Sequence, residues 1–462
     1  MGKIKITIED LFDIPGATIY NPDVFKGVTN VVIDSRKATK GSLFVAVKGD
    51  KFDGHDFVLN AVQNGAAAVV IDKKKLNKFK SLEIPVITVN DTIKAYGDIA
   101  KTWRNKLTAK VICITGSNGK TTVKEMIATL LEEKYKVVKT EANKNNHIGV
   151  PLTIFSADEK SGILVLELGT NHFGEIEYTS NISRPDISII TNIGDSHLEF
   201  LKNREGVYKE KSVLFSVTDK CGGTVFVNME DPVIKKEIKS YSNKITYGFA
   251  GAADIKGKIL KYLDNGRTII EITVKGNTFK TTLPVYGRSN SRNYLAAAAA
   301  ALYMGMTIKQ IIAGTKKIKQ VNGRLNVKEL KNIVLIDDTY NSNTTSIQSA
   351  VELVNKIKKY PKKFIVLGDI FEMGKYSGKI HKELAKLFSP NKNLTVLTIG
   401  RMMKVLNKSL TQKKIKSIHF NSREELSLFL KYEEIENSVI LIKGSRGMKM
   451  EEFVNIMETR FE

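Results

Sequence analysis

The chain has 462 residues, which corresponds to about three domains of ordinary size. Hydrophobic residues make up 42% and charged residues 26%, and the longest run of small and apolar residues, 295–306, is shorter than the ~20 residues that cross a bilayer. Two widely separated cysteines exclude a disulfide scaffold and a zinc finger. Because the first residues lack the pattern of a signal peptide, we expect a cytoplasmic protein without membrane insertion.

The chain is strongly basic, with 72 Lys and Arg against 49 Asp and Glu and a formal net charge of +23. Such a surplus suits nucleic acid, an anionic membrane surface or small polyanionic substrates, and its sign does not choose among them. The basic residues are spread over short clusters such as 73–80, 316–320 and 413–416, a distribution typical of a solvated surface. The sequence carries no helix-turn-helix, RNA-recognition or zinc signature, so we expect no nucleic-acid partner.

The first predicted domain covers residues 1–90. Short apolar runs at 31–34, 43–47 and 66–72 alternate there with turn-rich segments. This alternation is typical of a small α/β unit.

The second predicted domain covers residues 91–323. A helix around 93–107 leads into a β-rich run at 111–116, a glycine-containing loop and a second helix. The apolar residues of that second helix recur at helical spacing; they are Val123, Met126, Ile127, Leu130 and Leu131. Further strands are expected at 162–169, 186–194 and 224–228. The alternation of strands with helix-length segments predicts a mostly parallel, doubly wound sheet.

The third predicted domain covers residues 324–462, where the pattern restarts. Strands are expected at 332–338, 363–369, 394–400 and 437–444, and a helix is expected from about Ser346. These elements predict a third α/β unit.

The segment ITGSNGKTT, residues 114–122, lies between a predicted strand and an amphipathic helix. In such a turn the backbone N–H groups and the helix dipole bind phosphate oxygens, a lysine neutralises the β- and γ-phosphates, and a hydroxyl binds Mg²⁺. Ile114 stands where the commonest P-loop pattern has its first glycine, so the loop is a shorter variant. The predicted ATP-binding residues here are Gly116, Ser117, Asn118, Gly119, Lys120, Thr121 and Thr122, with Lys120 catalytic and Thr121 on the metal.

Seven further segments occur in the order seen in Mur ligases. They are EANKNNHIGVPLT (141–153), LELGTNHFGEI (166–176), TNIGDSHLEF (191–200), GRSNSRNYLAAAAA (287–300), NGRL (322–325), DDTYNSN (337–343) and KGSRGMKMEE (443–452). Over almost its whole length the chain therefore resembles the Mur ligase family. The resemblance implies an α/β fold of three domains, with a central P-loop domain built on a mostly parallel sheet and a Rossmann-like C-terminal domain. It also implies ATP, two Mg²⁺ ions and CO₂ bound as a lysine carbamate.

Three segments resemble one branch of the family, which adds a dipeptide: DDTYNSN, VLGDIFEMG (366–374) and SRGMKME (445–451). The DYAHTP-like and DNPR motifs of the branch that adds lysine or diaminopimelate are not present. The implied reaction is ATP-dependent ligation of D-alanyl-D-alanine to UDP-N-acetylmuramoyl-tripeptide through an acyl phosphate. The third residue of the tripeptide, lysine or diaminopimelate, stays open, and a monomer is expected.

The resemblance assigns Glu167, His197 and Lys211 to the metal site, the last two also as catalytic residues. The alternatives are a strand-end Glu167 turned to water, a His197 that is no ligand because imidazole is not the usual partner of Mg²⁺, and a solvent-facing Lys211. By the resemblance, Lys211 aligns with the lysine that Mur ligases carbamylate with CO₂. Here Ser212 follows it where the relatives usually have glycine, and Lys209 is the next lysine to consider.

The remaining ATP contacts implied by the resemblance are Asn290 and Asn293 at the adenine, Arg324 at phosphate and Asp338 at ribose. From the residues alone, helix capping is the favoured interpretation of the two asparagines, and a surface position that of Arg324. Thr344 stands where the family usually has proline, and it is expected to cap the helix that follows.

The resemblance also assigns a set of substrate-binding residues. In the first domain Ser35 and Arg36 contact UDP while Asp53, Gly54 and His55 shape its pocket, although His55 is equally consistent with a residue that only holds the turn. The others are Asn146 and His147 near the sugar-peptide, Tyr340, Asn341 and Asn343 in the cleft, and Lys443, Ser445 and Arg446 near the incoming dipeptide.

Two rival functions remain from the sequence. One is another amide ligase of the superfamily, such as a folylpolyglutamate synthase or the lysine-adding Mur ligase, and the DSR and DGHDF segments argue against the folate enzyme. The other is a nucleic-acid-binding P-loop ATPase, which the +23 charge suggests.

Overall fold

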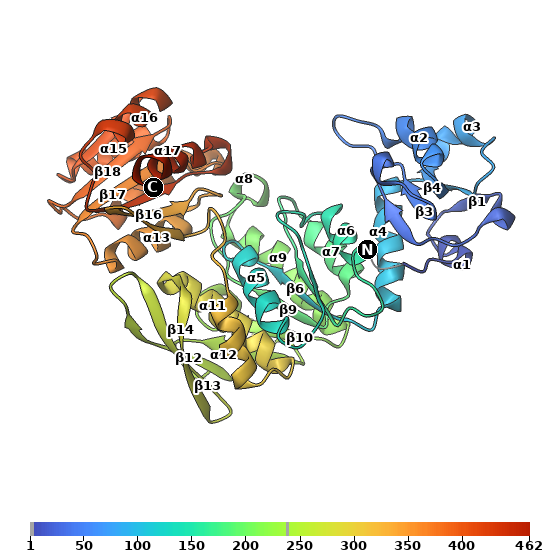
Figure 1. Cartoon of the computed structure of the whole chain (residues 1–462), viewed down its shortest axis with the longest axis horizontal. Coiled ribbons are helices and arrows are strands. Elements are labelled where there is room, and N and C mark those ends of the chain that lie inside the picture. The colour runs from blue at the N-terminus through green and yellow to red at the C-terminus, as the bar shows by residue number, and fades with distance from the viewer. Residues whose placement is uncertain (1–3, 237–239) are drawn as a thin grey trace.

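The computed structural model describes residues 4–236 and 240–462; residues 1–3, at the start of the predicted first domain, and 237–239 lie outside the described part. Sheets of five, nine and six strands follow one another along the chain and form three bodies in space (Figure 1). The predicted α/β class with three mostly parallel sheets is confirmed. None of the helices in the described part has the length and apolar composition needed to span a membrane.

The first sheet has the strand order β1-β5-β4-β3-β2 and is parallel except for β1, which pairs antiparallel with β5. Its strands are β1 (Thr18–Tyr20), β2 (Asn30–Val32), β3 (Ser42–Val45), β4 (Ala66–Asp72) and β5 (Val86–Val89). Its helices are α1 (Ile8–Phe12), α2 (Val58–Gln63) and α3 (Leu76–Phe79). The strands expected from the apolar runs are present.

The middle sheet is parallel from β7 to β12, in the order β12-β11-β10-β9-β6-β8-β7. These strands are β6 (Lys110–Thr115), β7 (Val137–Lys139), β8 (Ile163–Glu167), β9 (Ile187–Ile190), β10 (Thr224–Asn228), β11 (Lys244–Gly248) and β12 (Ile255–Tyr262). The predicted parallel sheet is therefore present.

Two antiparallel strands, β13 (Arg267–Val274) and β14 (Asn277–Tyr286), extend this sheet beyond β12, and the sequence analysis did not anticipate them. A signal for them exists. Asp264-Asn265-Gly266 and Lys275-Gly276 are short turns between alternating runs, and Gly266, Lys275 and Gly276 all have positive φ. That combination is typical of β-hairpins.

Helices cover both faces of the middle sheet. On one face lie α5 (Lys120–Leu131), α11 (Gly287–Tyr303) and α12 (Ile308–Lys317); on the other lie α4 (Thr92–Lys106), α6 (Gly149–Phe155), α7 (Glu175–Ser183) and α9 (Arg204–Lys220). Two short helices, α8 (Leu198–Leu201) and α10 (Pro232–Lys236), follow β9 and β10. The apolar stripe of α5 and the alanines of α11 are buried against each other, because small side chains let the two helices approach closely.

The third sheet has the order β15-β16-β20-β17-β18-β19 and is parallel apart from β15. Its strands are β15 (Asn326–Leu330), β16 (Ile333–Asp338), β17 (Lys362–Gly368), β18 (Leu394–Ile399), β19 (Ser417–Phe420) and β20 (Ser438–Lys443). Its helices are α13 (Thr344–Lys356), α14 (Ser377–Glu383), α15 (Met403–Gln412), α16 (Arg423–Tyr432) and α17 (Glu451–Phe461). All four predicted strands are present.

The chain segment that enters the third sheet is hydrogen-bonded to that sheet and not to the middle one. The amide of Gln320 exchanges two hydrogen bonds with the backbone of Val327, at 3.0 and 2.7 Å. The Gly323 N–H donates to Asp337 and the Leu325 N–H to Asp338, at 3.1 and 3.0 Å. Residues 320–325 are therefore fixed to the third sheet.

Candidate active site

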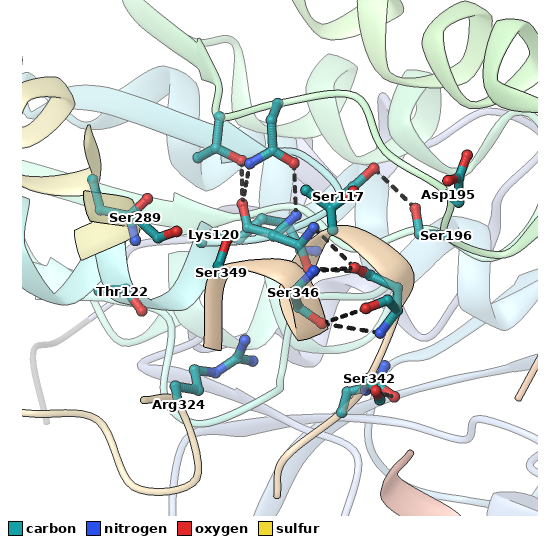
Figure 2. A pocket seen from close by; sticks show the side chains of 18 of the residues that line it. Ser117, Lys120, Thr122, Asp195, Ser196, Ser289, Arg324, Ser342, Ser346 and Ser349 are labelled. Carbon is teal, nitrogen blue, oxygen red and sulfur yellow. Dashed lines mark hydrogen bonds between the residues drawn. The ribbon is translucent and has the colours of Figure 1, made fainter. Parts of the chain in front are cut away.

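A cavity of about 470 Å³ lies between the middle sheet and the third sheet (Figure 2). Its walls come from the loop after β6, the segment after β9, the start of α11, the segment 323–325 and the ends of β16 and β20. The predicted site residues that line it are Ser117, Asn118, Gly119, Lys120, Thr122, His197, Asn290, Asn293, Arg324, Asp338, Tyr340, Asn341, Asn343, Lys443, Ser445 and Arg446. Residues more than 200 positions apart are thus brought to one site.

The loop between β6 and α5 has the geometry of a phosphate-binding turn. Gly119 precedes α5 with φ +84°, and Gly116 has φ +144°. A Cβ at Gly116 would lie 1.9 Å from the Thr191 hydroxyl oxygen, so no larger residue fits there. The ammonium of Lys120, the first residue of α5, donates to the Gly116 carbonyl at 2.7 Å.

Asn192, which follows β9, holds this loop by accepting hydrogen bonds from two of the loop's N–H groups. Its carbonyl accepts from the Ser117 N–H at 3.0 Å and its side-chain oxygen from the Asn118 N–H at 3.1 Å. Its amide also donates to the Asn118 carbonyl at 3.0 Å. The N–H groups of Ser117 and Asn118 are thus already used within the protein, and those at the start of α5 remain as candidates for a phosphate.

Lys120 is a desolvated cation without an ion-pair partner in the described part of the chain. Burial lowers its pKa, the Glu167 carboxylate opposes this effect, and the Arg324 guanidinium adds to it. The three groups are consequently near one another. A bound polyanion would supply the negative charge that this region lacks.

Glu167 ends β8 and is only 1% exposed, so the alternative of a strand-end carboxylate turned to water is wrong. One of its oxygens accepts a hydrogen bond from the Asn145 amide at 2.8 Å. The other, Oε2, is buried and makes no hydrogen bond within residues 4–236 and 240–462. A buried carboxylate oxygen in this state is expected to have a ligand.

Lys211 lies on α9 and is fully buried, so the alternative of a solvent-facing lysine is also wrong. Its Nζ has no hydrogen-bond partner among the described residues. Burial and the nearby Lys120 ammonium hold its pKa well below the ordinary range. The amine is therefore shifted toward the neutral, nucleophilic form.

The neighbouring Glu210 does not neutralise Lys211, because its carboxylate has other partners. It accepts hydrogen bonds from the N–H groups of Gly174 and Ile176, both at 2.8 Å, and from the Thr170 hydroxyl at 3.2 Å. Glu210 thus holds the start of α7. No local sequence pattern predicts this role, because Glu210 lies 34 to 40 positions from the residues that it binds.

His197 contacts the third domain. It has φ +53°, and its Nδ1 lies 2.6 Å from the Oε2 of Glu372, outside hydrogen-bonding alignment. The His197 ring lowers the pKa of the Glu372 carboxyl. The Glu199 N–H also donates to the Glu372 carbonyl at 3.2 Å. Glu372 lies within the segment VLGDIFEMG, but its place opposite His197 was not predicted.

Asp338 and Lys443 form a buried pair at the ends of β16 and β20, with 2.6 Å between Oδ2 and Nζ. Burial raises the pKa of the Asp338 carboxyl, although Lys443 opposes the shift. The Lys443 ammonium also donates to the Asn341 carbonyl at 2.9 Å. Lys443 is only 1% exposed, and its ammonium orders the 338–341 loop.

Side-chain hydrogen bonds join the start of α13 to the middle domain. The amides of Asn118 and Asn343 exchange hydrogen bonds at 2.8 and 3.3 Å, and the Thr344 hydroxyl donates to Asp195 at 2.9 Å. Asn343 is the N-cap of α13 and shares a capping box with Ser346. The expectation that Thr344 is the cap is therefore wrong, because the preceding asparagine has that role.

Asn290 and Asn293 lie inside α11, whose N-cap is Tyr286, so the alternative that these asparagines cap the helix is wrong. The Asn293 amide donates to the Asn290 carbonyl oxygen at 3.3 Å. The same end of the cavity is lined by Asn228, Glu230 and Tyr247, which the sequence analysis did not single out.

Several predicted residues lie outside this cavity. They are Gly116, Thr121, Glu167, Lys211, Asn146, His147, Ser35, Arg36, Asp53, Gly54 and His55. Thr121, Glu167 and Lys211 are buried, whereas Asn146 and His147 are exposed on the segment before α6.

In the first domain the predicted polar residues are bonded to one another. The Arg36 guanidinium donates twice to Asp34, at 2.9 and 2.8 Å, and lowers the pKa of that carboxyl to about 2. His55 is buried, with Nδ1 2.6 Å from Asp53 and Nε2 accepting from the Asp72 N–H at 2.9 Å. Both ring nitrogens of His55 are therefore in use within the domain.

Family models match the chain in three consecutive parts. Residues 27–104 match "Mur ligase family, catalytic domain", residues 114–301 match "Mur ligase middle domain", and residues 323–446 match "Mur ligase, glutamate ligase domain". The three parts correspond to the three sheets described above.

Similar proteins include UDP-N-acetylmuramoyl-tripeptide–D-alanyl-D-alanine ligases of Bacillus subtilis, 34% identical with 98% of each chain covered, and Escherichia coli, 32% identical with 98% of this chain and 99% of that one covered. Among solved structures, MurF from Acinetobacter baumannii matches with a TM-score of 0.88 at 29% identity, covering 99% of this chain and 100% of that one. MurF ligase from Thermotoga maritima in complex with ADP matches with a TM-score of 0.83 at 29% identity, covering 93% and 97%.

All three family regions occur in order along one polypeptide, and relatives above 30% identity align with it over 98% or more of their length. The chain belongs to the Mur ligase family.

Proposed function

We propose that this chain joins D-alanyl-D-alanine to UDP-N-acetylmuramoyl-tripeptide, with ATP converted to ADP and phosphate, in the synthesis of the peptidoglycan precursor. The observation that carries the proposal is the cavity in which the loop before α5 faces Arg324, Asp338 and Tyr340 of the third domain. The relatives that align over the whole chain carry this activity in their names.

ATP binds with its phosphates at the start of α5, where Lys120 and Arg324 carry uncompensated positive charge. Its adenine lies toward Asn290 and Asn293, and the Asp338 carboxylate is placed to accept from ribose hydroxyls. The similar MurF ligase from Thermotoga maritima was solved in complex with ADP, which supports a nucleotide at this place.

Two Mg²⁺ ions are expected, and two buried oxygen-bearing residues outside the cavity lining would hold them. Glu167 offers a carboxylate oxygen that makes no hydrogen bond among the described residues, and Thr121 offers a hydroxyl in the first turn of α5. The described residues contain no group of three His, Cys, Asp or Glu side chains preformed around a metal, so further oxygen ligands must come from ATP, water or a modified residue. His197 is the remaining protein ligand. When bound, Mg²⁺ neutralises charge on the transferred phosphoryl group.

A carbamate on Lys211 supplies one of those oxygen ligands. Carbamylation needs a neutral amine, and the lowered pKa and unpartnered Nζ of Lys211 provide one. The reaction joins the amine nitrogen to the carbon of CO₂ and releases one proton. A neutral amine thus becomes an anion.

The chemistry requires no side-chain nucleophile. The terminal carboxylate of the tripeptide attacks the γ-phosphorus, the bond to the β-phosphate oxygen breaks, and ADP leaves with an acyl phosphate formed. The free amine of D-alanyl-D-alanine then attacks the acyl carbon, and the tetrahedral intermediate loses phosphate and a proton to give the amide. Lys120 and Arg324 stabilise the charge that develops on the phosphoryl oxygens.

The three predicted domains divide the substrates among them. Residues 1–90 bind the UDP end through Ser35, Arg36 and the 53–55 turn, and Asn146 and His147 face the sugar-peptide. Residues 91–323 bind ATP. Residues 324–462 bind the incoming dipeptide through the 443–446 loop together with Asn341 and Asn343. The enzyme acts as a monomer.

A substrate panel tests the proposal. Phosphate release is measured with UDP-N-acetylmuramoyl-tripeptides that end in lysine or diaminopimelate, with and without D-alanyl-D-alanine. Turnover that requires both partners supports the proposal. Strong turnover with UDP-N-acetylmuramoyl-dipeptide and free lysine would instead show the lysine-adding activity, and DNA-stimulated turnover that ignores D-alanyl-D-alanine would show an ATPase of another class.

A further inference from the structure

The ring of Tyr340 lies against two guanidinium groups at the wall of the cavity. The Arg324 Cζ is 3.9 Å from the ring centroid, and the Arg446 Cζ is 6.0 Å from it. The first distance is that of close stacking, and the second is near the limit of a cation–π contact. Tyr340 therefore contacts one arginine from the entry to the third sheet and another from the loop after β20.

Arg324 forms no ion pair within residues 4–236 and 240–462. The carboxylate near it, Asp338, is already paired with Lys443 at 2.6 Å. Its positive charge is felt at Lys120, whose pKa it helps to lower. The aromatic ring is thus the contact that fixes the direction of this guanidinium, which projects into the pocket (Figure 2).

The backbone places the ring and the guanidinium together. The Tyr340 N–H donates to the Gly323 carbonyl at 3.0 Å, one residue before Arg324. Gly323 has φ +70°, and a Cβ there would lie 3.1 Å from the Tyr340 nitrogen. This close approach of the two segments brings the side chain of residue 324 onto the face of residue 340.

We propose that Tyr340 is a positioning residue, which holds the Arg324 guanidinium toward the nucleotide phosphates through the face of its ring. The inference rests on the proposed function, in which ATP occupies this cavity. It replaces a direct role of Tyr340 on the peptide substrates, because the guanidinium at 3.9 Å covers the ring. The Tyr340 hydroxyl is not needed for this role, whereas an aromatic ring is.

Binding of a non-hydrolysable ATP analogue, measured by calorimetry without the other substrates, tests the inference. Tyr340→Phe should bind within about twofold of the wild type. Tyr340→Leu should bind about 5- to 30-fold more weakly, which is the range of a cation–π contact. Arg324→Ala should be at least as weak, and Tyr340→Leu combined with Arg324→Ala should be no weaker than Arg324→Ala alone.

Tyr376→Leu is the matched control, because Tyr376 is an exposed tyrosine of the same domain that lies beside Lys375 and outside the cavity. It should leave the affinity unchanged, and thermal melts check that every variant is folded. Three outcomes would overturn the inference. Tyr340→Phe and Tyr340→Leu could lose affinity for the analogue equally, or the losses of affinity could add in the double variant. The third is a Tyr340→Leu defect confined to the KM for D-alanyl-D-alanine. The binding measurements do not depend on whether D-alanyl-D-alanine is the true acceptor, which the substrate panel decides separately; only the KM comparison uses that acceptor.

Discussion

The loop after β6 and the loop around Arg36 to His55 in the first domain both present basic side chains at the ends of parallel strands, yet their charges are handled differently. In the first domain the Arg36 guanidinium is paired with Asp34, and the His55 ring lies against Asp53. Lys120 and Arg324 in the cavity, and the buried Lys211 outside it, have no carboxylate within ion-pair distance among the described residues.

This difference shows where the protein itself lacks the negative charge that a bound anion would supply. A buried cation without a counter-charge destabilises the fold unless something supplies the missing anion. Where a buried cation has no counter-charge in the protein, we expect a bound ligand to provide the anion. Paired residues such as Asp53 and His55 are explained by the local structure without any ligand.

The largest expected effect comes from Lys120→Ala. Removing the cation at the start of α5 should lower the rate of ADP formation by about 10³-fold or more, because the charge on the transferred phosphoryl group loses its nearest donor. The melting temperature should stay close to that of the wild type, since Lys120 bonds only the Gly116 carbonyl. The measurements are the turnover rate and a thermal melt.

Lys124, one turn further along α5, is the matched control. It is fully buried, but it is paired with Glu125 at 2.9 Å and donates to the Thr140 carbonyl at 2.5 Å. Lys124→Ala should destabilise the protein by about 2–4 kcal/mol and leave the rate of the folded enzyme within a few-fold. A lowered melting temperature in Lys120→Ala, together with a loss of turnover alone in Lys124→Ala, would contradict this distinction between an unpaired and a paired lysine.

The second effect concerns Lys211. Lys211→Ala removes the proposed carbamate and should slow turnover by about 10²- to 10⁴-fold. Acetate should partly restore the rate by entering the vacated space, whereas Lys211→Arg should not be active, because arginine keeps its positive charge and is not carbamylated in the same way.

CO₂ dependence checks the same group in the unaltered protein. Removing CO₂ from the buffer should lower the wild-type rate, and returning it should restore that rate. Full activity of Lys211→Arg, or a rate that ignores CO₂, would contradict the carbamate, and Lys209 would be tested next.

A smaller effect is expected in the first domain, at His55. His55→Ala leaves the Asp72 N–H without its acceptor and should destabilise the protein by about 1–3 kcal/mol. The exposed His147, changed to Ala, is the control and should leave the free energy of unfolding unchanged. A loss of UDP binding in His55→Ala without any loss of stability would show that His55 binds the nucleotide and does not only hold the turn.

The smallest effect is expected at Arg36. The Asp34 carboxyl has a pKa of about 2 because Arg36 donates to it, so Arg36→Ala should return that pKa toward ~3.9. The stabilisation by this pair is fully present above about pH 4 and is lost as the pH falls toward 2. NMR titration of the Asp34 carboxyl measures the shift. The pair is exposed, so the melting temperature at pH 7 should hardly change.

The sequence predicts those parts of the site that lie within one short segment. The loop 114–122 is an example, because its glycines, lysine and helix start are consecutive and each follows from local geometry. The parallel strands and the buried stripe of α5 are similarly local, since periodicity of apolar residues is enough to place them.

Pairings across the chain were not predictable. Asn118 and Asn343 are 225 residues apart, and Asp338 and Lys443 are 105 apart. Each of these residues has an ordinary alternative explanation as a cap or a surface group, and only the packing of the two sheets selects the partner. Glu372 opposite His197 belongs to the same class.

The hydrogen bonds of residues 320–325 determine where the molecule can bend. α12 ends at Lys317, Ile318 is buried in the middle domain, and Gln320 is already bonded to Val327 of the third sheet. If the third domain rotates relative to the middle one, we expect the chain to turn at the backbone of Lys319. Arg324 and Tyr340 follow Lys319 and are bonded to the third sheet, so the distance from Arg324 to Lys120 would report such a rotation.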